Sequence, residues 1–298
     1  MASRSRPTTG RVTSPSAERF QLSGPSVHLD PRTHAVRRDI ADISLADRVF
    51  APHYAAPERC ACAATAAMLR AAPHDDAVAV SQIARGEGFA VVDQSGGWAW
   101  GYGDHDGYVG YVRADALGPT APASHFVAVA AAPLFARADI KAPVRATLGI
   151  GARIAGGQSG DFIETEAGFA HRRHLIAAGA READWVAVAE RLLGAPYLWG
   201  GRGDGGIDCS GLVQRALGLA GIACPRDSDQ QRALGGEIAA GDTLRRGDII
   251  LFTGHVGLMV DGDRLIHANA FWMAVTVEPL AAVVARGAAI VARRRISA

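Results

Sequence analysis

The chain has 298 residues, 49% of them hydrophobic and 20% charged, and its formal net charge is +1 at pH 7. This length and apolar content suit a folded protein of two or three domains. A near-neutral charge gives nucleic acid no electrostatic attraction, and no stretch approaches the roughly 20 apolar residues that span a bilayer. We therefore expect neither nucleic acid nor a membrane as a partner.

Two different segments precede the first predicted strands. Residues 1–25 are rich in Ser, Thr, Pro and Arg, which is typical of a disordered tail. Their basic residues are not followed by the apolar run of roughly 7 to 15 residues that secretion requires, so we expect a cytoplasmic protein. Residues 26–48 place Val36, Ile40 and Ile43 at helical spacing, which predicts an N-terminal helical segment.

Residues 49–178 combine short apolar strands with glycine and turn residues, a pattern typical of small β-barrels. The run Gln94–Trp98 is echoed at Gln158–Phe162, and a glycine-aromatic strand signal follows each copy. Matching spacing favours two tandem units. We predict a first barrel over residues 49–120 and a second, more diverged one over residues 121–178.

A glycine-rich run at residues 199–207 leads directly into Asp208 and Cys209. The apolar spacing from Leu212 to the stop at Gly221 predicts a helix with Asp208 as its N-cap and Cys209 in its first turn. Free amides and the positive end of the helix dipole favour a thiolate, so we expect the thiol pKa to fall below about 8.5. Cys209 is therefore the candidate nucleophile. We expect the glycine run to permit a close backbone approach to the substrate.

A cysteine nucleophile needs a base, and two histidines lie on a predicted downstream hairpin. Its strands are expected at residues 248–252, 256–260 and 265–268. A three-residue loop with Gly262 in the left-handed conformation would place His255 directly opposite His267. A two-residue turn would instead place Val256 opposite His267. In the first register both imidazoles share one face, so that one can act on the thiol while the other orients it.

These residues resemble the NlpC-type cell-wall cysteine peptidases, whose fold is a reduced papain-like core. The resemblance covers residues 179–298 and rests on five blocks in the order of that family. The blocks are Gly194–Gly201, Asp208–Val213, Pro225–Gln231, Leu244–Phe252, and His255–Val260 followed by Ile266–Ala268. The implied fold class is α+β, with a helix packed on an antiparallel sheet.

The resemblance also implies roles for individual residues. Cys209 corresponds to the nucleophile, His255 to the general base, and His267 to the group that orients the base. Asn269 lies two residues further on the same face and is the alternative orienting group. Tyr197 matches a family tyrosine that lines the oxyanion site beside the amide of Cys209. The implied chemistry is acyl transfer to sulfur, followed by hydrolysis.

The upstream units resemble bacterial SH3-like domains. Two such barrels before the peptidase core are similar to a subgroup that cleaves γ-D-glutamyl bonds to a diamino acid in peptidoglycan stem peptides. The implied substrate carries a free N-terminal L-Ala, whose ammonium needs nearby carboxylates and hydroxyls. Motif position assigns that contact to Asp208, Ser210 and Ser228.

The first barrel is expected to wall the cleft and to contribute two further substrate contacts. The resemblance carries these over to Glu87 and Tyr108, with Tyr102 or Tyr111 as alternatives for the tyrosine. A cytoplasmic location would suit recycling of small muropeptides. Two rival functions remain open: an amidase or acyltransferase on the same core, and a non-catalytic peptidoglycan-binding module.

The four cysteines neither pair at convincing spacing nor match a zinc pattern. We therefore expect reduced thiols, with no metal and no cofactor.

Overall fold

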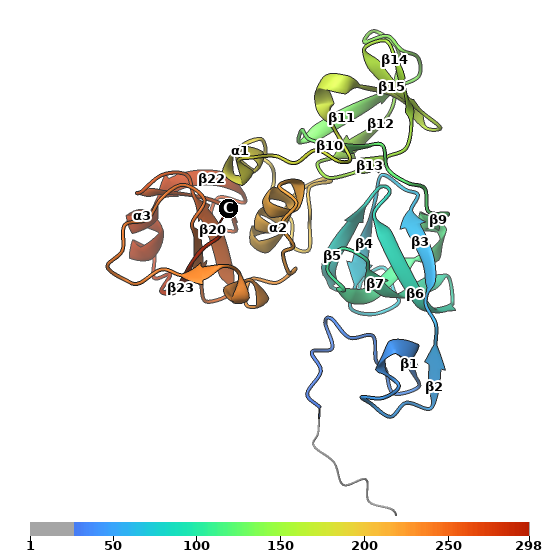
Figure 1. Cartoon of the computed structure of the whole chain (residues 1–298), viewed down its shortest axis with the longest axis horizontal. Helices are drawn as coiled ribbons and strands as arrows, with labels where there is room; N and C mark the ends of the chain where they lie inside the picture. The colour runs from blue at the N-terminus through green and yellow to red at the C-terminus, as the bar shows by residue number, and fades with distance from the viewer. Residues whose placement is uncertain (1–26, 298) are drawn as a thin grey trace, which may run out of the picture.

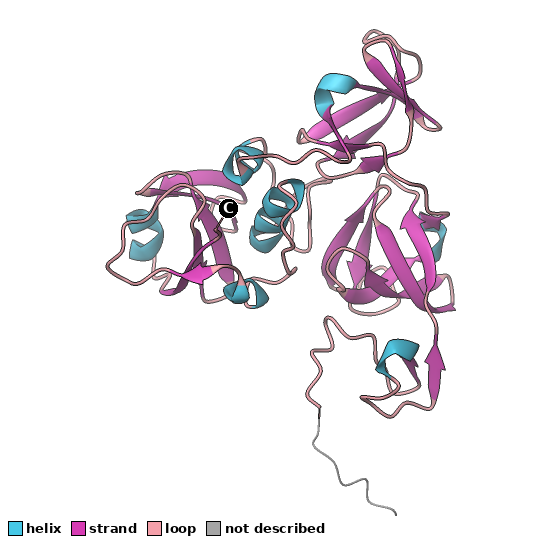
Figure 2. Ribbon diagram, in the orientation of Figure 1, coloured by secondary structure: helices cyan, strands magenta, loops and turns pink. Residues whose placement is uncertain are grey.

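The computed structural model describes residues 27–297 as a β-rich α+β protein. Figure 1 shows the C-terminal unit, residues 179–297, in orange and red beside two small β units in blue to yellow-green; it is called the catalytic unit below because it carries Cys209 and His255. Figure 2 shows that helices are few and short, and the three α-helices all lie in the C-terminal unit of the described chain. The predicted α+β class is confirmed. Within residues 27–297, no helix has both the length and the apolar character needed to cross a membrane.

The first β unit is one seven-stranded sheet in the order β5-β4-β8-β7-β6-β3-β9. The strands are β3 (Glu58–Cys62), β4 (Ala66–Arg70), β5 (Ala79–Ala84), β6 (Gly88–Ser95), β7 (Trp98–Gly103), β8 (Val109–Arg113) and β9 (Leu117–Gly118), with the 3₁₀ turn η2 (Ala114–Ala116). Its core contains Leu69, Ile83, Phe89 and Val112, all essentially buried. The β-branched and aromatic strand residues thus fill the inside of a curled sheet.

The second β unit has two sheets, with strand orders β12-β11-β16-β15-β14 and β13-β10-β17. Its elements are β10 (His125–Val127), β11 (Ala131–Phe135), β12 (Val144–Gly149), β13 (Arg153–Ile154), β14 (Gly157–Ser159), β15 (Phe162–Thr165), β16 (Gly168–His171), η3 (Arg172–His174) and β17 (Leu175–Ala177). A shared core joins the two sheets around Leu134, Leu148 and Ile163.

The sequence echo marks equivalent hairpin turns in the two β units. Residues 94–98 form the turn from β6 to β7, and residues 158–162 form the turn from β14 to β15. Gly96 and Gly160 occupy the same place in the two copies, with φ of 59° and 61°. Only glycine adopts this left-handed conformation without strain, which explains why the residue recurs.

The predicted helix within residues 26–48 is wrong. The segment contains β1 (Ile40–Asp42), the short 3₁₀ turn η1 (Ile43–Leu45) and, further on, β2 (His53–Ala55), which pairs with β1 in parallel. Its apolar residues pack on the first β unit, where Ala35 is buried with Trp100. Tertiary packing therefore overrides the helical spacing. The predicted tail at residues 1–25 lies outside the described residues.

The catalytic unit is a six-stranded sheet in the order β18-β23-β19-β20-β21-β22. Its elements are α1 (Trp185–Glu190), α2 (Cys209–Leu219), η4 (Gln230–Ala233), β18 (Gly236–Glu237), β19 (Ile249–Phe252), β20 (His255–Met259), β21 (Arg264–Asn269), β22 (Ala274–Pro279), α3 (Leu280–Ala285) and β23 (Ile290–Arg295). Every residue of α2 except Gly218 is buried. The sheet covers one side of α2 with Val256, Leu258 and Ile266.

The register of the β20–β21 hairpin differs from the predicted one by two residues. Met259 lies opposite Leu265, whereas a register with His255 directly opposite His267 would place Met259 opposite Asp263. The loop is longer because the Asp261 carboxylate accepts hydrogen bonds from the amides of Asp263 and Arg264. Gly262 does not adopt the left-handed conformation. A shift of two residues keeps every side chain on its face, so the two histidines still share a side.

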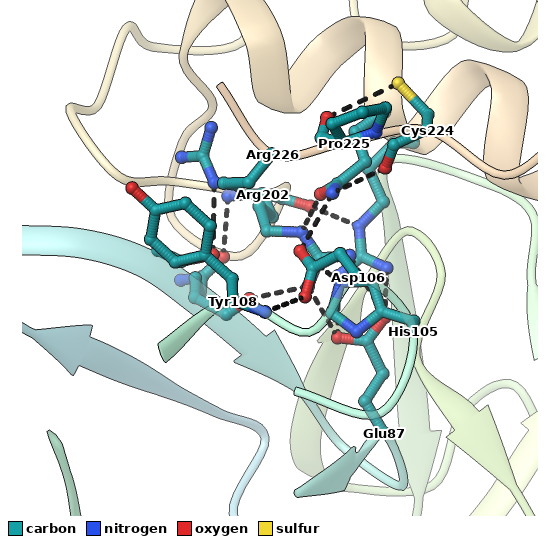
Figure 3. A network of polar contacts seen from close by, with 12 residues as sticks. Glu87, His105, Asp106, Tyr108, Arg202, Cys224, Pro225 and Arg226 are labelled. Atoms are coloured by element: carbon teal, nitrogen blue, oxygen red, sulfur yellow. Dashed lines mark hydrogen bonds and ion pairs between the residues drawn. The ribbon is translucent and has the colours of Figure 1, made fainter. Parts of the chain in front are cut away.

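Buried ion pairs cover the other side of α2, where the first β unit meets the catalytic unit (Figure 3). The Glu87 carboxylate forms ion pairs with the guanidinium groups of Arg202 at 2.8 Å and Arg215 at 2.6 Å. All three side chains are almost inaccessible to solvent. Burial alone would raise the pKa of Glu87, but the two guanidinium groups hold it well below its ordinary value. Gln214 of α2 also donates to Asp106 of the first β unit at 2.9 Å.

The glycine-rich run makes its close contacts with the β units. A Cβ at Gly200 would lie 3.1 Å from Ala79, and one at Gly203 would lie 2.6 Å from Ile150. Gly200 and Gly203 thus permit a close approach between domains, while the expected close approach to the substrate stays a prediction. These glycines let the loop that leads to Cys209 fit between the two β units.

We expect Glu87→Gln to lower the free energy of unfolding by about 3 to 5 kcal/mol, because it leaves two buried guanidinium groups without their partner. Urea unfolding at pH 7 measures the loss, and Glu164→Gln, on the exposed side of β15, should change stability by less than about 0.5 kcal/mol. The Glu87 contribution is fully present above its ordinary pKa of 4.5 and disappears as the pH falls through its lower folded value. Equal stability of the two variants at pH 7 would contradict this role.

Candidate active site

Helix α2 presents Cys209 as its first residue, as the sequence predicted. Asp208 is the N-cap, and its carboxylate accepts the amide of Gly211 at 2.7 Å. The Cys209 side chain packs with Val256 of strand β20, and the backbone amides of Val256 and Ser210 act to lower its pKa. Cys209 is only 6% exposed. The nucleophile is thus held between the helix and the strand that carries His255.

The two histidines form a hydrogen-bonded relay that continues to a carboxylate. Nε2 of His255 lies 2.8 Å from Nδ1 of His267, and Nε2 of His267 lies 2.8 Å from Oε1 of Glu278 on β22. The two imidazoles meet diagonally across β20 and β21, which their shared face allows. Because His255 uses Nε2 for this bond, Nδ1 is its remaining nitrogen.

The sequence predicted a lowered pKa for the Cys209 thiol, and the structure reverses that direction. Burial, followed by the negative charge of Asp208, raises the pKa of Cys209 to about 11 in spite of the helix N-terminus. Burial, followed by His267, lowers the pKa of His255 to about 4. Burial also lowers the pKa of His267. At pH 7 the resting site therefore contains a neutral thiol and neutral imidazoles.

Both carboxylate oxygens of Asp208 accept hydrogen bonds from other groups of the protein. Arg226 binds both of its carboxylate oxygens, and the amide of Gly200 donates to Oδ2 at 2.9 Å. Ser210 donates to Oδ1 at 3.3 Å and accepts from Arg226 at 2.8 Å. A carboxylate offers about four acceptor positions, and Asp208 has filled them. The structure thus leaves Asp208 without a free acceptor position for the predicted contact with a substrate ammonium. The Ser210 hydroxyl accepts from Arg226 alone and keeps one acceptor position, so its role stays a prediction.

Two of the predicted contacts from the first β unit have different outcomes. Glu87 is buried between Arg202 and Arg215, so its assignment to the substrate is wrong. The ring of Tyr108 lies in the barrel core, and its hydroxyl donates to Asp227 at 2.8 Å. Burial and Asp227 raise the pKa of Tyr108, which keeps the hydroxyl protonated. Tyr108 therefore reaches the loop that carries Ser228, and Figure 3 shows it beside Arg226.

Ser228 and Tyr197 are half-buried and keep their predicted roles as predictions. Tyr197 lies near the thiol, since Cys209 and Asp208 act with burial to raise its pKa to about 12. The alternative tyrosines do not share the position of Tyr108: Tyr102 donates to Asp42, and Tyr111 accepts from Arg37.

Asn269, the alternative orienting group, makes other contacts. Its amide nitrogen donates to Thr276 at 2.8 Å, and its oxygen accepts the backbone amide of Trp272. Asn269 thus holds the connection between β21 and β22, while His267 contacts His255.

Sequence reasoning missed two residues that shape this site. Arg226 was only part of a matching block, yet it binds Asp208 and Ser210 and receives support from Ser81 of the first β unit at 3.0 Å. Glu278 belongs to no quoted block. The one available signal was its position on a strand following His267, where cross-strand pairing puts carboxylate and imidazole within reach.

No group of three or more His, Cys, Asp or Glu residues within the described chain is arranged to hold a metal ion. The reactive groups are instead a thiol at the N-terminus of α2 and an oriented imidazole on β20, the strand that packs against this helix. This combination defines the class of cysteine peptidases, in which the base is positioned by a third group.

Two stretches of the chain match models of known protein families. Residues 194–294 match the NlpC/P60 family, and residues 69–117 match the bacterial dipeptidyl-peptidase Sh3 domain. The chain carries an NlpC/P60 peptidase domain preceded by a bacterial SH3 domain, as its sequence resemblance predicted.

Curated relatives are similar over the catalytic unit. A probable endopeptidase of Mycobacterium tuberculosis (strain ATCC 25618 / H37Rv) is 39% identical over 106 residues, which cover 35% of this chain and 27% of that protein. The gamma-D-glutamyl-L-lysine dipeptidyl-peptidase of Bacillus subtilis (strain 168) is 33% identical over 93 residues, 28% of this chain and 31% of that protein. The chain thus matches about a third or less of each relative's length.

A solved structure extends the likeness to the whole fold. The crystal structure of an NlpC/P60 family protein from Bacillus cereus ATCC 10987 has a TM-score of 0.69 at 19% sequence identity. It covers 80% of this chain and 99% of that chain. At this identity the likeness concerns the fold alone.

We expect His255→Ala to slow alkylation of Cys209 by iodoacetamide at pH 7 by about 100-fold, because the buried neutral thiol then has no base. In the wild type the rate should vary little between about pH 5 and pH 9, since the pKa values of His255 and Cys209 lie near 4 and 11. Peptide mapping by mass spectrometry separates Cys209 from the more exposed Cys60. His174→Ala, in the second β unit, is the control. A wild-type thiol that titrates below pH 7 would contradict the neutral pair.

Proposed function

We propose that the protein is a cysteine peptidase that hydrolyses the γ-D-glutamyl–diamino acid bond of peptidoglycan stem peptides with a free N-terminal L-Ala. The observation that carries this proposal is the placement of Cys209 against the β20 strand that bears the His255–His267 relay. The matched SH3 domain type and the named activity of the Bacillus subtilis relative support the choice of bond.

The chemistry begins with proton transfer from the Cys209 thiol to Nδ1 of His255. The sulfur attacks the γ-carbonyl carbon of D-Glu, and its oxygen takes up negative charge beside the amide of Cys209 and the hydroxyl of Tyr197. The imidazolium of His255 then gives its proton to the leaving amine of the diamino acid. A water molecule, deprotonated by His255, hydrolyses the thioester and restores the thiol.

The loop around Ser228 is the proposed place for recognition of the substrate ammonium, since protein donors already fill the carboxylate of Asp208. Arg32 forms ion pairs there with three carboxylates, those of Asp30, Asp227 and Asp229. One cation among three anions leaves this cluster with a net negative charge, which favours an ammonium group. Tyr108 holds Asp227 in place from the first β unit. Asp227 with Ser228 is therefore the proposed contact for the L-Ala amine.

The decisive test of the bond is mass spectrometry of L-Ala-γ-D-Glu-meso-diaminopimelate incubated with the protein. The wild type should release L-Ala-D-Glu and free diaminopimelate, and Cys209→Ala should release neither, because no other group can form the thioester. Cys60→Ala is the matched control and should retain full activity. Binding without cleavage by the wild type would favour the binding module, and cleavage at another amide would favour an amidase.

Asp227→Asn should raise KM for this tripeptide about 10-fold and change kcat little, because it removes charge that is used in binding. The N-acetylated tripeptide should be cleaved poorly by both proteins, since it has no ammonium. Steady-state kinetics measure both effects, and Asp263→Asn in the exposed β20–β21 loop is the control. Equal cleavage of free and acetylated peptides by the wild type would remove the free amine from the proposal.

The proposal includes a cytoplasmic role in recycling muropeptides. All four cysteines are free, as in a reducing compartment. Cell fractionation with an antibody against the protein tests the location.

A further inference from the structure

Glu278 is held firmly at the end of the histidine relay. Both terminal nitrogens of Arg286 donate to the Glu278 carboxylate, Nη1 to Oε2 at 2.7 Å and Nη2 to Oε1 at 2.9 Å. Oε1 also faces Nε2 of His267 at 2.8 Å. Burial acts to raise the pKa of Glu278, but hydrogen bonds from Arg286, Trp272 and His267 outweigh it and lower the pKa to about 2. Glu278 is thus an anion that can only accept hydrogen bonds.

Because Glu278 can only accept, it determines which nitrogen of each histidine carries the proton. His267 must carry its proton on Nε2 in order to donate to Glu278. Neutral His267 then has a bare Nδ1, which can only accept, so His255 must donate from its own Nε2. The remaining nitrogen of His255, Nδ1, is left unprotonated. A neutral imidazole has one donor and one acceptor nitrogen, and no other arrangement satisfies both 2.8 Å contacts.

We propose that Glu278 is a positioning residue that sets the tautomers of both histidines and so leaves Nδ1 of His255 free to accept the thiol proton. This inference rests on the proposed cysteine-peptidase function. With a hydrogen-bond donor in place of Glu278, the relay would reverse, and His255 would present an N–H where the thiol needs a base.

The same carboxylate stabilises the charge that forms during the reaction. When the thiol proton moves to Nδ1, His255 becomes an imidazolium that donates through Nε2 to His267. His267 donates in turn to Glu278, so negative charge lies at the end of the relay and no second proton has to move. The charged and titratable groups that face this pathway are Cys209 from α2, His255 from β20, His267 from β21, Glu278 from β22 and Arg286 after α3.

Two variants separate this role from that of a surface ion pair. Glu278→Gln removes the negative charge and offers His267 either a carbonyl or an NH₂ group, so we expect the tautomers to mix and the alkylation rate of Cys209 at pH 7 to fall by about 10- to 100-fold. Glu190→Gln makes the same change in the exposed ion pair with Arg246, away from the histidines, so the rate should stay within about threefold of the wild type. Equal losses in both variants would overturn the proposal.

A direct readout is the ¹⁵N NMR spectrum of histidine-labelled protein, with the two resonances assigned through His255→Gln and His267→Gln. In the wild type both residues should be protonated on Nε2 alone, and Glu278→Gln should move a share of the protons to Nδ1. Protonation of His255 on Nδ1 in the wild type would overturn the proposal without any variant. Neither readout needs a peptide, so failure to cleave the tripeptide would count only against the proposed bond.

Discussion

The pair of Arg226 and Asp208 is the contact on which the catalytic unit depends. One carboxylate caps α2, fixes the loop at Gly200 and neutralises a buried guanidinium, while Arg226 also reaches Ser210 and Ser81. The cap places Cys209, and Ser81 ties the same arginine to the first β unit. A buried ion pair is costly unless its remaining hydrogen bonds are made, and here they are shared between two domains. The position of the nucleophile is therefore set by both.

Much of this arrangement could be predicted from local sequence. The N-cap at Asp208, the start of α2 and the hairpin with two histidines on one face depend on neighbours along the chain. The predicted register was wrong by two residues, but the two histidines still lie on the same face because side chains in a strand alternate with a period of two. The unforeseen turn came from the Asp261 side chain, whose hydrogen bonds lengthen the loop.

The errors share a physical cause, which is packing between segments far apart in sequence. Glu87 faces Arg202 and Arg215, whose nearness no local pattern reveals. Burial by strand β20 raises the pKa of Cys209, whereas the helix terminus alone predicted the opposite. The apolar residues near Ala35 lie on the first β unit, so they form no helix of their own. Glu278 likewise joins the relay only through the order of β20, β21 and β22.

The two covered sides of α2 have a consequence for the order in which the protein forms during synthesis. Domains emerge from the ribosome N-terminus first, so both β units can fold before β19 to β23 exist. Helix α2 can then dock its charged side on Glu87 and Asp106, but its apolar side stays open until the sheet is complete. His255, His267 and Glu278 all lie on that late sheet. A nascent chain therefore acquires its thiol before it acquires the two histidines and Glu278, and the site stays incomplete until β22 has been synthesised.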